Sequence, residues 1–294
     1  MNAVFQFLID ALSLGSIYAC IALGIALIFG VMNLVNLAHG ELIMVTGYTL
    51  LLTHGLPLPL RIIIAITAGV LAGILMDKLA FRFIRGAKPA TLMIVSFGIA
   101  YLLQNLAILF IGSQARAVAL PSWVSARISV GGIGVSPLDL VTVLVTVLLL
   151  AGMGLVLYRT PIGRQMRAAS EDFTMARLVG VKSDRVISTA FALAGFLAAV
   201  AGILLIAKTG TVTPTMGLAP LLAGVVATVI GGSGNLKAAV YGAYLFGALT
   251  VAIQAALPTD LVAFRDAVAF ALVILVLIVR PQGLFIRRAV AERV

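Results

Sequence analysis

Two ionisable side chains, His39 and Glu41, stand near the start of an apolar stretch and closely follow two amides, Asn33 and Asn36. Inside a membrane, ionisable groups are costly and usually face a cavity or a partner, so these four residues are candidates for lining a pathway. His39 and Glu41 could then relay protons. The alternative is structural: the same side chains would bond the free backbone groups at a break between two helices. The sequence leaves both interpretations open.

The sequence lacks the common motifs for binding nucleotides or metals and for nucleophilic catalysis. There is no GxxxxGK[ST] phosphate-binding loop, and the nearest stretch, GGSGNLK, has the wrong spacing. There is no HExxH or CxxC motif, only two histidines occur, and Cys20 is the one cysteine. We therefore expect no catalytic residues, no metal site and no cofactor bound by this chain. An intramembrane enzyme is disfavoured because no paired carboxylates or Ser/Lys pair stands out.

A second feature is the segment 159–185, RTPIGRQMRAASEDFTMARLVGVKSDR. Ser170 is a plausible N-cap, Glu171 and Asp172 would occupy the first turn where the helix dipole favours negative charge, and Gly180 is a natural stop. The apolar residues at helical spacing are Met175, Ala176, Leu178 and Val179. The pattern predicts a capped helix of about nine residues outside the bilayer with an exposed apolar stripe.

Such a helix has two possible uses. With its basic flanks it could rest on anionic lipid headgroups. It could instead insert into a groove on a cytoplasmic partner and transmit the partner's motion to the neighbouring spans. Composition alone does not choose between them.

The elements that position these residues follow from composition. The chain is 294 residues long, 62% hydrophobic and only 10% charged, with a mean hydropathy of +1.20. A soluble domain carries roughly 25% charged residues, so lipid must solvate most of this surface. We expect one membrane domain over 1–294. The net charge of +10 lies in short loops between apolar stretches, which indicates a topology signal rather than nucleic-acid binding.

Crossing about 30 Å of hydrocarbon takes roughly 20 helical residues. Nine apolar stretches meet or approach that length: 5–31, 38–53, 61–80, 90–112, 136–158, 186–208, 218–232, 236–256 and 262–280. The stretches 38–53 and 218–232 are weak, because one begins with polar residues and the other is short and ends in a glycine cluster. The pattern predicts an all-α, polytopic helix bundle of about eight transmembrane helices with broken or re-entrant segments.

Basic residues set the orientation. If all nine stretches cross, fifteen of the twenty Lys and Arg residues fall on one side, which should be cytoplasmic. The C-terminus is then inside and the N-terminus outside, unless 31–53 forms one re-entrant unit that brings the N-terminus inside. The first ten residues lack Lys and Arg, so we expect the first stretch to remain as a span.

The largest outer loop, 113–135, holds the one tryptophan, Trp123. It is either an interfacial anchor or part of a short strand or hairpin that contacts an external partner. The polar residues Asp10, Gln104 and Asn105 lie in apolar stretches and should make interhelical hydrogen bonds. Gly69 and Gly73, like the glycine cluster at 231–234, indicate close helix packing.

Four segments in order carry a resemblance to a known family. They are Asn36-Leu37-Ala38-His39-Gly40-Glu41, Arg159-Thr160-Pro161-Ile162-Gly163-Arg164 with Glu171-Asp172 and Gly180-Val181 downstream, Ile230-Gly231-Gly232-Ser233-Gly234-Asn235 with Gly242, and Arg280-Pro281-Gln282-Gly283-Leu284-Phe285. These segments resemble the permeases of branched-chain amino acid (Liv-type) ABC importers, and the LivH-like partner more than the LivM-like one. Ser233 and Lys237 depart from the family's pattern, and neither lies in the 159–185 loop.

The resemblance implies a permease subunit in the cell inner membrane that pairs with a second, LivM-like permease. Two cytoplasmic ATPase subunits would bind ATP and Mg²⁺, and an external solute-binding protein would deliver the solute. The loop helix would be the coupling helix, with Ser170, Glu171, Asp172, Met175, Ala176, Leu178 and Gly180 toward the ATPase. A branched-chain or other aliphatic amino acid is the expected solute. Urea or aromatic acids within the same family, or a stand-alone proton-coupled carrier, are the alternatives.

Overall fold

The computed structural model describes residues 2–32, 34–124, 126, 128–130, 133–232 and 235–280. Within them, seven segments are long and apolar enough to cross a membrane. They are α1 (Asn2–Met32), α3 (Leu58–Met76) with its continuation to Ile84, α5 (Pro89–Ile111), α6 (Pro137–Arg159), α9 (Ser183–Thr209), α11 (Leu236–Ala256), and the 3₁₀ turn Thr259–Phe264 with α12 (Arg265–Val279). The predicted all-α bundle is confirmed.

Two further helices are half as long. Helix α2 (His39–Leu52) and helix α10 (Leu218–Gly231) have 14 residues each, which span about 21 Å. They are the two stretches that the sequence marked as weak. Each is preceded by a non-helical stretch, residues 34–38 before α2 and residues 213–217 before α10. The seven long helices are one fewer than the predicted number of about eight, and the two short helices bring the total to one more.

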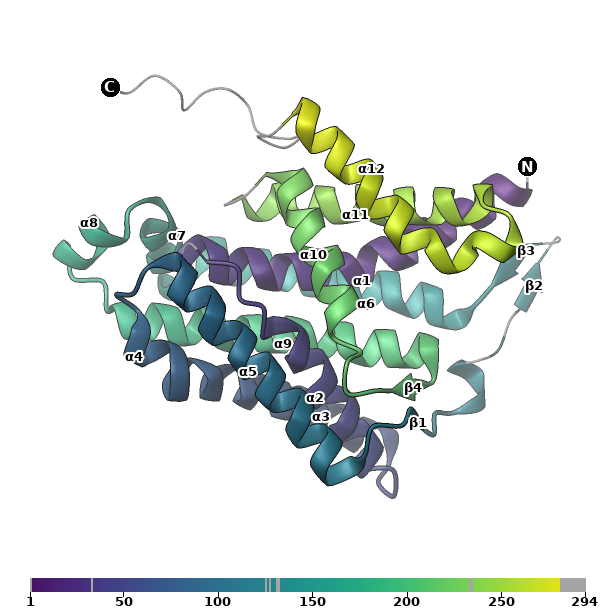
Figure 1. The fold of residues 1–294 in the computed structure, drawn as a ribbon, viewed down its shortest axis with the longest axis horizontal. Helices are drawn as coiled ribbons and strands as arrows, with labels where there is room; N and C mark the ends of the chain where they lie inside the picture. Colours follow the sequence, from purple (N-terminus) through teal and green to yellow (C-terminus); the bar gives the residue numbers. More distant parts are fainter. Residues whose placement is uncertain are drawn as a thin grey trace.

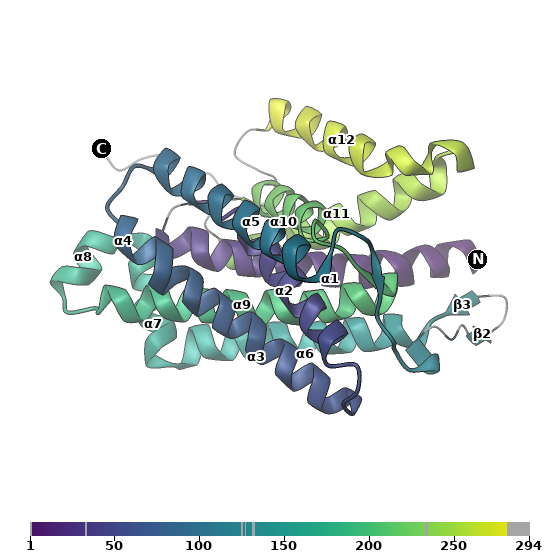
Figure 2. The same ribbon diagram turned by 60° about the horizontal axis from the view of Figure 1, so that its bottom comes forward.

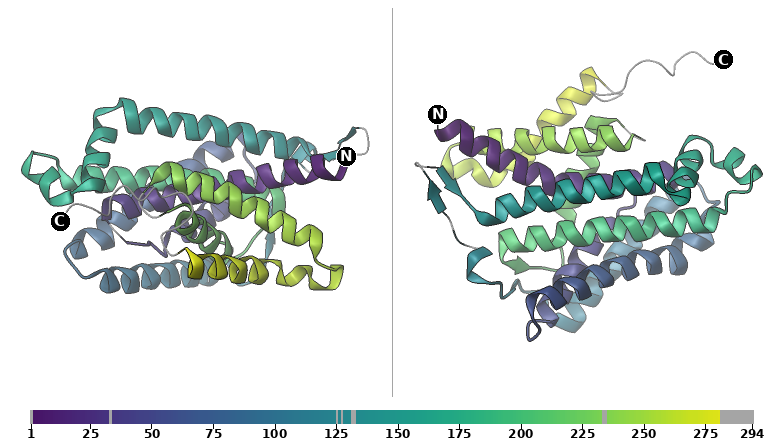
Figure 3. Two further views of the ribbon diagram at one scale, coloured as in Figure 1. Left: turned by 90° about the horizontal axis from the view of Figure 1, so that it is seen from above. Right: turned by 180° about the vertical axis from the view of Figure 1, so that it is seen from behind.

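Helix α1 runs through the middle of the bundle, where α6, α9, α10 and α11 surround it (Figure 1). Most of its apolar length is buried, whereas α12 lies at the edge against α11 (Figure 2). Helices α6 and α9 run beside each other along the long axis (Figure 3). A helix that is apolar on all sides must be covered on all sides by protein or lipid, and in α1 the cover is mostly protein.

Glycines let α3 and α9 approach closely. A Cβ added at Gly69 would lie 2.7 Å from Ala199 Cβ, and one at Gly73 would lie 2.5 Å from the carbonyl oxygen of Phe191. Small residues at such contacts allow the backbones to meet, which is how helices pack where lipid removes the hydrophobic drive. The packing interpretation of Gly69 and Gly73 is therefore confirmed.

The two ends of the bundle differ (Figure 1). The loop end carries α4 (Arg82–Ile84), α7 (Pro161–Glu171) and α8 (Phe173–Leu178). The strand end carries two small antiparallel pairs, β1 (Arg116–Ala117) with β4 (Thr211–Val212), and β2 (Ile128–Val130) with β3 (Ile133–Val135). The hairpin expected within 113–135 is present, and Trp123 lies just before it in a 3₁₀ turn (Ser122–Val124).

Candidate functional site

The loop 159–185 forms two helices rather than one. Thr160 caps α7, because its hydroxyl accepts a hydrogen bond from the Gly163 N–H, and Pro161 occupies the first helical position. Asp172 then caps α8, because its Oδ1 accepts the Met175 N–H at 2.9 Å. The loop thus has two well-defined helix starts.

The expected role of Ser170 as the N-cap was wrong. Ser170 lies inside α7, where its hydroxyl donates to the Arg167 carbonyl at 2.7 Å, and Glu171 is the last residue of that helix rather than in a first turn. The reason is that Thr160-Pro161 starts a helix ten residues earlier, so the chain is already helical at Ser170. Asp172, with extended backbone, is the acceptor that the next helix uses.

Helix α8 exposes most of its apolar side chains. Met175, Leu178 and Val179 are exposed, Leu178 by 77%, whereas Ala176 is buried. Gly180, at φ +90°, ends the helix in a left-handed conformation that favours glycine, as expected. The predicted exposed apolar stripe is therefore present at the loop end.

Helix α7 fixes this loop to the bundle. Met166 and Ala169 are buried against the core, and a Cβ at Gly163 would collide with the backbone of Leu157 in α6. The Arg167 guanidinium lies 4.7 Å from the centre of the Tyr158 ring at the end of α6. Since α7 also packs on α1 and α9, displacement of α8 would reach three long helices through one rigid segment.

A buried ionic cluster ties the same end together. Asp77 is fully buried in a π-helical turn (Asp77–Phe81) that continues α3. It accepts from Arg85 at 2.6 Å and from the Ser188 hydroxyl of α9, while Arg85 also pairs with Asp184 in the first turn of α9. Because α9 begins at Ser183, within the last residues of the loop, this cluster joins the end of the loop to the connection between α3 and α5. The cluster could not be predicted from the sequence, because Asp77 and Arg85 lie about a hundred positions before Asp184 and Ser188.

The second part of the site is the junction where the two short helices begin. Gly40 of α2 lies against Gly217, the residue before α10, since a Cβ at Gly40 would be 2.5 Å from the Gly217 carbonyl oxygen. Both helices therefore direct their N-terminal ends toward the interior of the bundle. Helix N-termini carry partial positive charge and free N–H groups, as at the half-helix sites of transporters.

The pathway candidates diverge at this junction. Asn36 is buried and its Oδ1 accepts the Ala38 N–H at 3.0 Å, so it supports the break. Glu41 is buried, and its Oε1 accepts from Gln104 Nε2 of α5 at 2.8 Å, which is the interhelical bond expected of Gln104. Its Oε2 has no hydrogen-bond partner among the described residues.

His39 points elsewhere. Its buried ring lies against Gly24 of α1, since a Cβ at Gly24 would be 2.7 Å from His39 Cε1, and neither ring nitrogen has a partner among the described residues. His39 and Glu41 therefore contact different neighbours and do not form one relay pair. The fourth candidate, Asn33, lies outside the described residues, as do the glycine cluster's Ser233 and Gly234 and the closing segment 281–294.

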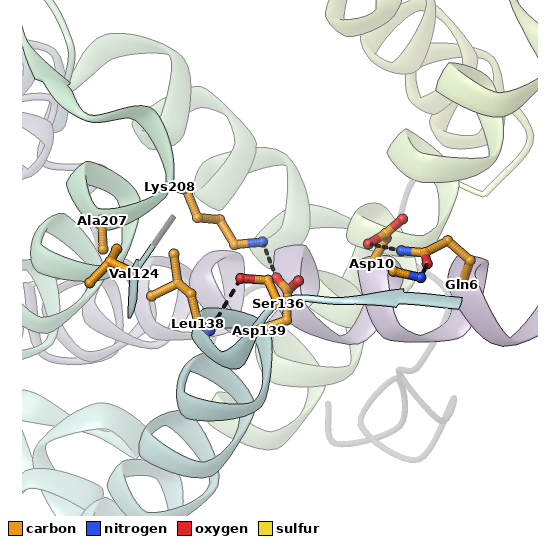
Figure 4. Close-up of a pocket in the computed structure, with 9 residues that line it drawn as sticks. Gln6, Asp10, Val124, Ser136, Leu138, Asp139, Ala207 and Lys208 are labelled. Atoms are coloured by element: carbon orange, nitrogen blue, oxygen red, sulfur yellow. Dashed lines mark hydrogen bonds and ion pairs between the residues drawn. The ribbon is translucent and has the colours of Figure 1, made fainter. Parts of the chain in front are cut away.

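The strand end holds a polar cavity that the sequence did not reveal. Its volume is about 660 Å³, and Gln6, Asp10, Asp139 and Lys208 are among its lining residues (Figure 4). Lys208 of α9 pairs with Asp139 of α6 at 2.8 Å, and Asp139 also accepts from the Ser13 hydroxyl of α1. Asp10 bonds Gln6 within α1, not a second helix as expected. Charged side chains of α1, α6 and α9 thus line this cavity.

Among the described residues, no three His, Cys, Asp or Glu side chains gather as metal ligands would. The main features are a loop with an exposed apolar stripe at one end, a polar cavity at the other, and two short helices between them.

Comparison with known proteins agrees with this arrangement. The model of the family described as the branched-chain amino acid transport system permease component matches residues 7–277. The high-affinity branched-chain amino acid transport system permease protein BraD of Pseudomonas aeruginosa is 33% identical, over 98% of this chain and 97% of its own. The corresponding LivH protein of Escherichia coli is 32% identical over the same shares.

A solved structure shares the fold. A chain of PsaBC from Streptococcus pneumoniae, determined in complex with Fab, superposes with a TM-score of 0.53 at 17% identity, covering 94% of this chain and 92% of that one. At this identity the likeness concerns the fold alone.

Proposed function

We propose that this chain, which belongs to the branched-chain amino acid transport system permease family, is a permease subunit of an ABC importer. Its solute would be an aliphatic amino acid such as leucine. The chain is a multi-pass membrane protein and a transport component. The substrate is inferred from BraD and LivH, which are named as branched-chain amino acid permeases and match this chain over nearly its whole length.

The observation that carries the proposal is the loop end. A six-residue helix with exposed Met175, Leu178 and Val179 stands outside the bundle on a rigid base, α7. An apolar stripe of this kind fits a groove on a partner. We assign it to the ATPase subunits, with Asp172 as its structural cap and Gly180 as its stop. The loop end is then cytoplasmic and the strand end external, as the distribution of Lys and Arg favours.

The other partners follow from the same assignment. A second, LivM-like permease would complete the membrane core, and an external solute-binding protein would deliver solute at the strand end. ATP and Mg²⁺ would be held by the two ATPase subunits, because the sequence carries no phosphate-binding loop of its own. Binding of ATP there would move α7 and α8, and alternating access would follow from tilting of α1, α6 and α9.

The experiment is co-purification of the complex from membranes. Leu178→Asp places a charge in the exposed stripe and should remove most of the ATPase that co-purifies with the permease. Leu52→Asp is the matched control, because Leu52 is similarly exposed (67%) at the end of α2 away from the loop end. It should retain the ATPase. Equal retention by both variants would refute the docking role of α8.

A further inference from the structure

Helix α5 has an unusual outward face. Its central exposed residues include Tyr101, which is 62% exposed, and Asn105, which donates an amide hydrogen to the Tyr101 carbonyl at 2.7 Å. Gly98 lies on the same stripe, and a Cβ added there would meet no atom within 4 Å. Apolar residues flank this region on both sides, at Ile94 and Leu109. The middle of α5 therefore presents polar groups and open space.

The outward faces of α6, α12 and α3 are different. Away from their ends, the exposed residues of α6 and α12 are aliphatic, such as Leu144 and Leu148 of α6 and Leu272 and Leu275 of α12. Helix α3 exposes one polar residue there, Thr67, whose hydroxyl bonds its own helix at Ile63. These faces are suited to hydrocarbon. Among the described parts of these four helices, α5 alone exposes a carboxamide within about 10 Å of its midpoint.

The one hydrogen bond to Tyr101 satisfies a single N–H of the Asn105 carboxamide, so facing hydrocarbon would leave its other N–H and its carbonyl oxygen without the hydrogen bonds that water supplies. Polar residues within spanning helices accordingly face other helices or water-filled cavities. Asn105 lies about 8 Å from the centre of α5, well inside a core of about 30 Å. The polar stripe of α5 is therefore not a lipid-facing surface in the assembled protein.

The inner side of α5 connects this stripe to the junction. Ser96 accepts the Leu37 N–H in the stretch before α2, and Gln104 donates to Glu41 Oε1. The second carboxylate oxygen of Glu41 has no hydrogen-bond partner among the residues that the structure describes, and Glu41 lies behind the partly exposed Gln104. The side-chain carbonyl oxygen of Gln104, with the Glu41 carboxylate behind it, is complementary to an ammonium group. The order of groups from outside to inside is thus Asn105 and Tyr101, Gln104, then Glu41.

We propose that Gly98, Tyr101, Gln104 and Asn105 line the solute pathway, across which they face the second permease subunit, and that they contact the polar end of a zwitterionic amino acid. This inference rests on the proposed function and assigns its pathway to one helix face. The solute's ammonium group is placed toward Gln104 and Glu41. The absence of a bulky side chain at Gly98 leaves room for the solute beside Tyr101.

The single cysteine of the chain makes a direct test possible. Cys20 is the one cysteine of this chain, so a Cys20→Ala background leaves the chain without thiols, and labelling is measured on this chain after separation from its partners. Into it go Asn105→Cys and, as the matched control, Leu148→Cys, where the native leucine is 64% exposed on the apolar face of α6. The complete importer in proteoliposomes is treated with the cationic, membrane-impermeant thiol reagent methanethiosulfonate ethyltrimethylammonium.

The proposal expects Asn105→Cys to react at least tenfold faster than Leu148→Cys, and L-leucine with the solute-binding protein to slow that reaction severalfold. Equal rates at the two positions, or a rate at Asn105→Cys that leucine does not change, would overturn it. If Asn105→Cys does not assemble, Tyr101→Cys takes its place with the same expectations.

The outcome is separable from the proposed function. Leucine uptake and bound ATPase are measured on the Cys20→Ala parent before labelling. A parent that couples ATP to uptake, with an unreactive Asn105→Cys, refutes the pathway and leaves the importer assignment intact. A parent without bound ATPase refutes the importer assignment itself.

Discussion

The cap of α8 allows a graded perturbation of the proposed coupling element. In Asp172→Ala the Met175 N–H loses the acceptor that now lies 2.9 Å away. Loss of such a cap costs about 1 kcal/mol. A six-residue helix has little stability of its own to absorb that loss, so the equilibrium constant for forming α8 should fall about fivefold.

The measurement is ATP-dependent uptake of L-leucine by proteoliposomes titrated with ATPase subunits. If docking requires the folded α8, the ATPase concentration that gives half-maximal uptake should rise in Asp172→Ala, by up to about fivefold. Asp172→Asn keeps an oxygen acceptor without the charge and should stay within about twofold of the parent, since Asn and Asp cap about equally well.

Two results would refute this reasoning. If Asp172→Asn is as impaired as Asp172→Ala, the carboxylate's charge matters and the cap does not. If Asp172→Ala is indistinguishable from the parent, α8 is not recognised as a folded helix.

Two further predictions concern the loop-end cluster and the junction. Arg85→Gln leaves the buried Asp77 without its cation, which should cost on the order of 3 kcal/mol and lower the unfolding midpoint in detergent. Arg82→Gln should change that midpoint little, because the native Arg82 guanidinium is exposed and lies 3.9 Å from Asp184. Equal midpoints for the two variants would contradict the cluster's structural role. Gly40→Ala places a Cβ 2.5 Å from the Gly217 carbonyl oxygen and should abolish uptake, whereas Gly152→Ala, with open space around it, should leave uptake unchanged or slightly stabilise α6. Normal uptake in Gly40→Ala would show that α2 and α10 need not meet closely.

Much of the architecture could be predicted from the sequence, because the length of hydrocarbon fixes the length of a span. The stretch 136–158 corresponds to α6 and 236–256 to α11, within a residue at each boundary. The two weak stretches were the two short helices for a physical reason, since each begins within the bundle after an irregular segment. The exposed stripe of α8 and its stop at Gly180 also followed from local signals.

The errors and omissions have physical causes as well. Thr160-Pro161 is itself a strong helix-start signal, and it makes Ser170 an interior residue of α7. The Asp77–Arg85–Asp184 cluster and the Asp139–Lys208 pair join residues far apart in the chain, so only the tertiary structure shows them. His39 and Glu41 looked like a pair in sequence. Positions i and i+2 point to different sides of a helix, so they contact different neighbours.

The most direct measurement is leucine uptake by proteoliposomes that contain this chain and its partner permease, with and without the ATPase subunits. We predict rapid uptake only when the ATPases, the solute-binding protein and ATP are all present, and none above background when the ATPases are omitted. Undiminished uptake without the ATPases, driven by a proton gradient alone, would contradict the account.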